Sequence, residues 1–165
     1  LTLTEALKHA HEAFDAILDE ARKAGLTVSG HVPLVMSWAE ASRAGLRTIE
    51  HIQTIFENLQ PDLQLTPARF TELADGLDGA IGDEIFGVLK ANGTYFDPTL
   101  VGYEATIDSA RPEAAAARRQ AYARMTPIAA KAARLGVPIV TGTDVLDRHG
   151  DLLLTELERL VAIGM

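Results

Sequence analysis

The chain has 165 residues, of which 47% are hydrophobic and 23% are charged, which is ordinary for a globular protein with a substantial core. Its formal net charge of −8 excludes the positive field that attracts nucleic acid or an anionic membrane surface, and no apolar run reaches the about 18 residues that cross a bilayer. The sequence has no cysteine, which excludes disulfides and thiolate chemistry and leaves the compartment open, with the cytoplasm favoured. We expect one domain, residues 1–165, that binds neither nucleic acid nor a membrane.

The first predicted helix covers residues 5–23, where apolar side chains recur at helical spacing and Thr4 suits the N-cap. A short β-rich run at 26–28 follows and stops just before His31. Pro33 has no N–H to give to a central ladder, so the strand cannot continue past it.

A second unit repeats this arrangement. Residues 38–44 predict a helix, and Gly45 suits a left-handed C-cap. Residues 46–50 form the next β run, which ends at His51. Two strands joined by one helix lie parallel, with their carboxyl ends at the same edge of the sheet. The sequence therefore predicts that His31 and His51 lie side by side at the edge where α/β proteins carry their chemistry.

Residues 53–93 have the least regular pattern of the chain. We predict short helices there at 54–58, 66–73 and 83–91. Turn-forming residues at 60–62 and 75–79 separate these helices. The segment gathers no core of its own, so we interpret it as an extended loop and helical insertion within the single domain.

The remaining sequence predicts two more strands. Residues 94–100 form the third strand and its exit, and Pro112 opens a long helix to about residue 135. Pro127 predicts a kink or break in that helix. The fourth strand ends at Asp144, and a loop at 147–150 leads to a final helix at 152–163. Alternating strands and helices predict a parallel sheet, open or closed.

Two imidazoles and a carboxylate, from His31, His51 and Asp144, thus follow apolar β runs and converge on one rim. This is a donor set suited to zinc, iron or manganese. One histidine at a strand end is more often a hydrogen-bonded loop residue, so the repeated placement carries the hypothesis. No glycine-rich phosphate loop follows any strand. An unrelated doubly wound α/β protein with fortuitous histidines remains an alternative.

Four short motifs, one at each strand end, resemble those of metal-dependent amidohydrolases, in particular imidazolonepropionase-like enzymes and Xaa-Pro or Xaa-Arg dipeptidases. They are Gly30-His31-Val32-Pro33, Ile49-Glu50-His51-Ile52, Asp97-Pro98-Thr99-Leu100 and Thr141-Gly142-Thr143-Asp144. The resemblance runs over nearly all of the chain. It implies an α/β fold that is the C-terminal half of a (β/α)₈ TIM-type barrel, strands five to eight with their helices.

The resemblance also implies a chemistry. His31, His51 and Asp144 would bind a divalent metal, with zinc favoured and with one or two ions in an intact enzyme. Asp144 would also act as general base in the hydrolysis of an amide or cyclic-amide C–N bond by a metal-activated water. The substrate would be a small-molecule or peptide-like amide. Three residues expected in loops after the last two strands would contact it: Tyr103, Arg148 and His149.

Two elements of the family pattern have no counterpart here, namely a histidine pair on strand one and a bridging lysine on strand four. The chain therefore resembles a fragment with an incomplete metal site, expected to be inactive alone. Its inner sheet face, which we expect Val28, Ile49 and Val140 to line, would favour self-association or pairing with the missing N-terminal half. A non-catalytic half-barrel that serves binding or assembly is the alternative.

Overall fold

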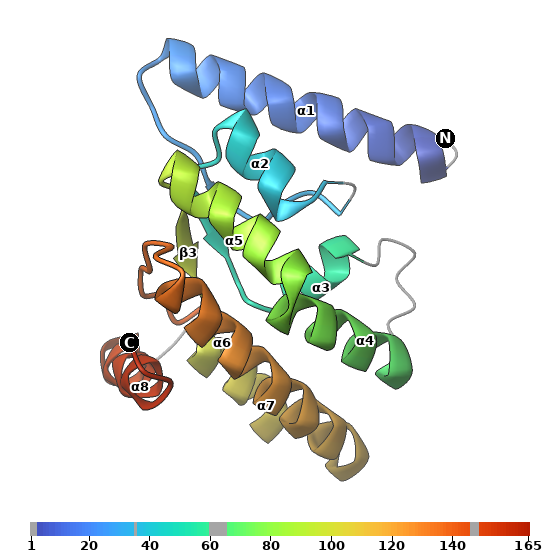
Figure 1. Cartoon of the computed structure of the whole chain (residues 1–165), viewed down its shortest axis with the longest axis vertical. Helices are drawn as coiled ribbons and strands as arrows, with labels where there is room; N and C mark the ends of the chain where they lie inside the picture. Colours follow the sequence, from blue (N-terminus) through green and yellow to red (C-terminus); the bar gives the residue numbers. More distant parts are fainter. Residues whose placement is uncertain (1–2, 35, 60–65, 146–148) are drawn as a thin grey trace.

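The computed structural model describes residues 3–34, 36–59, 66–145 and 149–165 (Figure 1). Its strands are β1 (Ser29–Gly30), β2 (Thr48–Glu50) and β3 (Tyr95–Asp97). Its helices are α1 (Leu3–Lys23), α2 (Trp38–Ala44), α3 (Thr54–Leu59), α4 (Pro67–Asp78), α5 (Ala80–Asn92), α6 (Leu100–Asp108), α7 (Pro112–Arg134) and α8 (His149–Ala162). None of these described helices is both long enough and apolar enough to cross a membrane.

The three strands form a parallel sheet in the order β1-β2-β3, which confirms the predicted direction of the strands. The first strand was misplaced, because the ladder forms at Ser29–Gly30 and residues 26–28 lie outside it. The predicted fourth strand is much shorter than expected. Only Ile139 bridges Phe96 of β3, with Val140 N donating to Phe96 O at 3.0 Å, and the chain then leaves the sheet well before Asp144.

The sheet has one apolar and one polar face. Ile49 and Phe96 are fully buried in the core, where the Trp38 ring of α2 lies 5.1 Å from the Phe96 ring. Side chains alternate along a strand, so the neighbours of these residues point the other way. Glu50 and Asp97 are accordingly half-buried on the opposite face. The prediction that Ile49 lines an exposed inner face is therefore wrong, because α2 and α5 cover its side of the sheet.

The turn predicted at residues 75–79 is also wrong, because α4 continues to Asp78. Leu77 is fully buried, and this anchors the last turn of the helix. Lys131 of α7 then donates from Nζ to the carbonyls of Leu77, Asp78 and Gly79, at 3.1, 2.6 and 2.6 Å. A lysine distant in sequence thus stabilises the carboxyl end of α4, where the helix dipole favours a cation.

The N-terminal helix starts at Leu3, so Thr4 lies inside it and is not its N-cap. Helix α7 runs unbroken through Pro127, which lies on its exposed side, where water can bond the carbonyl that proline leaves free. Helix α6 was not predicted. At the last predicted loop, His149 and Gly150 are helical, whereas 147–148 lie outside the described residues, as do the turn residues 60–62.

Candidate active site

The two strand-end histidines contact each other. The register pairs Gly30 with Ile49, so the residues that follow β1 and β2 leave the sheet at the same edge. The ring centroids of His31 and His51 are 4.5 Å apart, and the rings are nearly perpendicular. Asn58 of α3 fixes the loop after His31 by donating from Nδ2 to Pro33 O at 2.8 Å. His31 is exposed, whereas His51 is buried.

Asp144 reaches the same rim from the segment that follows the bridge between Ile139 and β3. Its Oδ2 lies 3.8 Å from His51 Nδ1, and its side chain is 57% exposed. Glycine at two positions permits this approach. A Cβ at Gly102 of α6 would lie 2.7 Å from Thr143 O, and a Cβ at Gly142 would lie 2.2 Å from Asp97 Oδ2. Only hydrogen at these positions allows α6 and the end of β3 to approach the segment that carries Asp144.

The backbone at this rim is unusual. The described non-glycine residues with a left-handed φ are His51 (67°), Thr99 (47°) and Asp144 (50°). His51 follows β2 directly, Thr99 lies two residues after β3, and Asp144 lies five residues after the bridge at Ile139. A residue held in such a conformation costs about 1–3 kcal/mol and persists only where its surroundings impose it, which happens most often at functional sites. The coincidence of all three at one edge marks that edge as the candidate site.

Thr99 contacts His51 instead of capping its own helix. Thr99 occupies the N-cap position of α6, but its side chain makes no cap hydrogen bond, and its Oγ1 lies 2.8 Å from His51 Nδ1. The capping is done by Glu156 of α8, which is 0% exposed and accepts from Leu100 N at 2.9 Å and Val101 N at 2.7 Å. The Thr99 hydroxyl is therefore available to orient the imidazole, and Nε2 of His51 is left for another partner.

Burial governs the protonation of these groups. It lowers the pKa of His51, an effect that nearby His31 reinforces and that the charges of Asp144 and Glu50 oppose. The neutral imidazole, whose lone pair can bind a metal, is therefore favoured. Burial also raises the pKa of Asp97 to about 6, although hydrogen bonds from the backbone of Gly142 and Thr99 act against it. The pKa of Glu156 is raised for the same reason.

The donor types fit a zinc-like ion, since imidazole nitrogen and carboxylate oxygen are its usual ligands. The arrangement is incomplete, however: within the described part of the chain, no three histidine, cysteine or acidic side chains form a group that could hold a metal. Asp144 lies near Nδ1 of His51, the nitrogen that also contacts Thr99. Its carboxylate is therefore not beside Nε2, the nitrogen with which His51 could bind a metal together with His31. His31 and His51 could supply two ligands, and further ligands would have to come from elsewhere.

Of the three expected substrate contacts, the structure describes the side chain of Tyr103 alone. Tyr103 lies on α6, not in a loop, and its ring stacks on Tyr122 with centroids 6.2 Å apart. Burial raises the pKa of Tyr103. Arg148 lies outside the described residues, as does the side chain of His149, whose backbone begins α8.

Three residues that position the site were not proposed as functional from the sequence. Asp97 and Thr99 stood in a recognised motif but were given no role, because their partners become neighbours only through strand pairing. Glu156 left a clearer signal, as a carboxylate on the apolar face of the last predicted helix. A buried carboxylate needs a partner, and here the partner is the amino end of α6.

No model of a known protein family matches the chain, and no curated protein matches it by sequence. Several solved structures are similar. A Xaa-Pro dipeptidase with methionine bound in its active site has a TM-score of 0.57 and 23% identity over 92% of this chain and 32% of its own. An A. niger ochratoxinase has a TM-score of 0.59 and 21% identity, and the match covers 92% of this chain and 28% of the ochratoxinase. A bottromycin amidohydrolase has a TM-score of 0.62 and 24% identity, and the match covers 92% of this chain and 40% of the amidohydrolase. The likeness shows a partial α/β fold, and this chain spans 28–40% of those proteins.

Proposed function

We propose that this chain is the strand-five-to-eight half of a (β/α)₈ barrel that hydrolyses amide or cyclic-amide C–N bonds with a divalent metal. The observation that carries the proposal is the contact between the His31 and His51 rings, with Asp144 beside them, at the carboxyl edge of a parallel sheet. The names of two similar structures, a dipeptidase and an amidohydrolase, support the reaction class. Because this chain spans 28–40% of those proteins, the proposal assigns the activity to a larger barrel of which this chain is one part.

In this proposal His31 and His51 hold the ion, and zinc suits them best. Thr99 fixes the His51 ring through Nδ1, so that Nε2 is the ligand atom. The ion, when bound, polarises the amide carbonyl and makes water a stronger acid. Asp144, exposed at the rim, takes a proton from the attacking water on a carboxylate oxygen and delivers it to the leaving nitrogen as the C–N bond breaks. The products are a carboxylic acid and an amine.

The reaction is tested on the longest protein that the gene encodes, with Xaa-Pro dipeptides and N-acyl amino acids as substrates. Zinc-dependent hydrolysis that a chelator abolishes, and that Asp144→Asn reduces by roughly 10²–10⁴-fold, is the expected result for a general base. Glu158→Gln, an exposed change on α8, is the matched control. Equal activity in Asp144→Asn and in the control would overturn the proposed role of Asp144.

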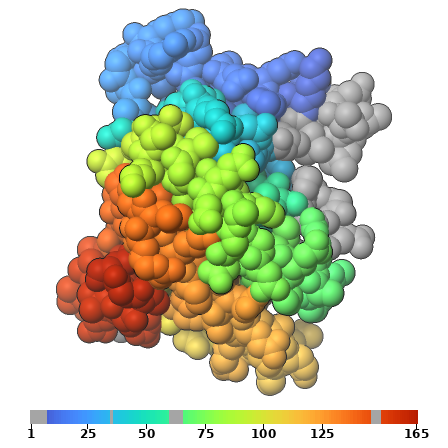
Figure 2. Space-filling view, viewed as in Figure 1, coloured from blue at the N-terminus to red at the C-terminus, as the bar shows by residue number. Residues whose placement is uncertain are grey.

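A second candidate, an assembly module, is supported by the outer face of α8. This helix lies at one flank of the molecule (Figure 2) and exposes one apolar stripe: Leu153, Leu154, Leu157 and Val161. Glu156 and Leu160, along one border of this stripe, are buried. In a closed barrel the first strand and helix would cover this stripe, and a second copy of the chain could cover it instead. A chain that dimerises through α8 without binding zinc would favour assembly over catalysis.

A further inference from the structure

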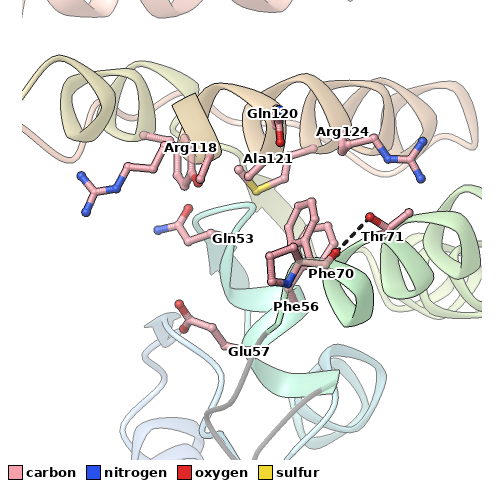
Figure 3. Close-up of a pocket in the computed structure, with 13 residues that line it drawn as sticks. Gln53, Phe56, Glu57, Phe70, Thr71, Arg118, Gln120, Ala121 and Arg124 are labelled. Atoms are coloured by element: carbon pink, nitrogen blue, oxygen red, sulfur yellow. Dashed lines mark hydrogen bonds between the residues drawn. The ribbon is translucent and has the colours of Figure 1, made fainter. Parts of the chain in front are cut away.

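A cavity of about 410 Å³ lies outside the candidate metal centre, between α3, α4, α6 and α7 (Figure 3). Phe56 and Phe70 form one wall, with ring centroids 4.5 Å apart and planes inclined by 19°. The Tyr103 ring and the buried Met125 add further apolar lining. Cavities of about 300–1,000 Å³ with mostly apolar walls and few polar groups are typical of small-molecule sites.

The two arginines that line the cavity direct their charged heads elsewhere. Figure 3 shows the guanidinium groups of Arg118 and Arg124 pointing away from the stacked rings. Arg124 pairs with Asp75, and Arg118 donates to the carbonyl of Thr106. The hydroxyl of Thr71 is also engaged, since it donates to Pro67 O at 3.0 Å. Only the hydrocarbon stems of the arginines are left to line the cavity.

Gln53 is the exception among these polar groups. It lines the cavity only two residues after His51, and its Oε1 is buried with no hydrogen-bond partner in the described structure. A buried acceptor without a partner costs about 1–3 kcal/mol. The last torsion of a glutamine side chain is soft, and rotating the amide exchanges Oε1 and Nε2, so that the oxygen would take the position that the NH2 group now holds. An occupant with an O–H or N–H group would satisfy it there.

We propose that this cavity binds a flat aromatic ring that carries a hydrogen-bond donor, as in a phenol or an indole, with Gln53 as the acceptor. The rings of Phe56, Phe70 and Tyr103 offer stacked and edge contacts that favour an aromatic occupant over an aliphatic one, and the Met125 sulfur adds to them. The ring can come from a free phenol or indole, or from a tyrosine or tryptophan side chain in a peptide. The inference does not depend on the hydrolase proposal, because binding requires neither metal nor catalysis.

The test titrates the described chain with p-cresol and with toluene, which differ by one hydroxyl group, and follows the cavity residues by NMR. The wild type should bind p-cresol roughly fivefold more tightly than toluene, the ratio expected for one net hydrogen bond. Gln53→Leu should remove that preference. Ala117→Phe, which places a ring in the cavity mouth from an exposed helical position, should weaken both ligands by at least tenfold. Ala116→Phe, exposed on the same helix outside the lining, is the matched control.

A third ligand, N-acetyltyrosinamide, separates the two sources of the ring. Binding at least as tight as that of p-cresol indicates a peptide side chain, and weaker binding indicates a free phenol. Both results support the site. Three results overturn it: no binding of p-cresol, equal affinity for p-cresol and toluene in the wild type, or the same affinity in Ala117→Phe as in Ala116→Phe.

Discussion

Glu156 offers a direct test of how α8 supports the candidate site. It is 0% exposed and accepts hydrogen bonds from two backbone N–H groups at the start of α6, Leu100 N and Val101 N. A hydrogen bond to a charged group contributes about 1.5–3 kcal/mol, so two of them contribute about 3–6 kcal/mol. Burying the carboxylate, which raises its pKa, offsets part of this gain. Glu156→Ala should therefore lower the free energy of unfolding by about 2–4 kcal/mol.

Urea denaturation followed by far-UV circular dichroism measures this change. Glu156→Gln keeps one acceptor oxygen and the same shape, so its loss should be about half as large. Glu158→Ala removes an exposed carboxylate from the same helix and should change stability by no more than about 0.5 kcal/mol. If Glu156→Ala proves as stable as Glu158→Ala, then Glu156 does not cap α6. In that case the cap does not explain why the Thr99 hydroxyl is available to His51.

Three further changes probe the rim itself. Thr99→Val should weaken zinc binding by roughly 10–100-fold because His51 loses its Nδ1 partner, and Thr99→Ser should restore most of the affinity; calorimetric titration of both variants decides this. Burial raises the pKa of Asp97 to about 6 in the folded protein, whereas the pKa of an unfolded aspartate is about 3.9. The stabilisation from Asp97 is therefore complete below a pH of about 3.9 and is lost as the pH rises through about 6. Asp97→Asn should therefore flatten the fall in melting temperature between pH 4 and 7 in chelator, and an unchanged slope would contradict the assignment. Gly142→Ala should destabilise the fold, since its Cβ would lie 2.2 Å from Asp97 Oδ2, whereas Gly87→Ala on α5 meets nothing within 4 Å and should stabilise it by about 0.5–1 kcal/mol in thermal unfolding.

Features set by local chemistry could be predicted from the sequence. Gly45 adopts the expected left-handed C-cap, with a φ of 109°, and Ser37 just before α2 adds a capping box. Thr66 and Pro67 start α4 as the residue types predict, with Arg69 N donating to Thr66 Oγ1. The repeated strand, helix and histidine pattern was enough to place His31 beside His51, because parallel pairing fixes which edge both reach.

Features set by distant partners could not be predicted in this way. The Asp-Gly-Leu-Asp-Gly segment has the composition of a turn, yet the buried Leu77 and the Lys131 ammonium keep it helical to Asp78. Which face of β2 is covered depends on the packing of α2 and α5, so the side on which Ile49 lies was assigned wrongly. The role of Thr99 depends on Glu156, which is 57 residues later in the sequence.

Zinc titration of this chain tests the central claim most directly. The wild type should take up zinc weakly, because two imidazoles leave a tetrahedral site to be completed by water. His31→Ala and His51→Ala should each reduce that uptake, whereas His11→Ala, on the exposed face of α1, should not. Uptake in the His31 and His51 variants equal to that of the wild type and of His11→Ala would contradict a metal centre at the carboxyl edge of the sheet.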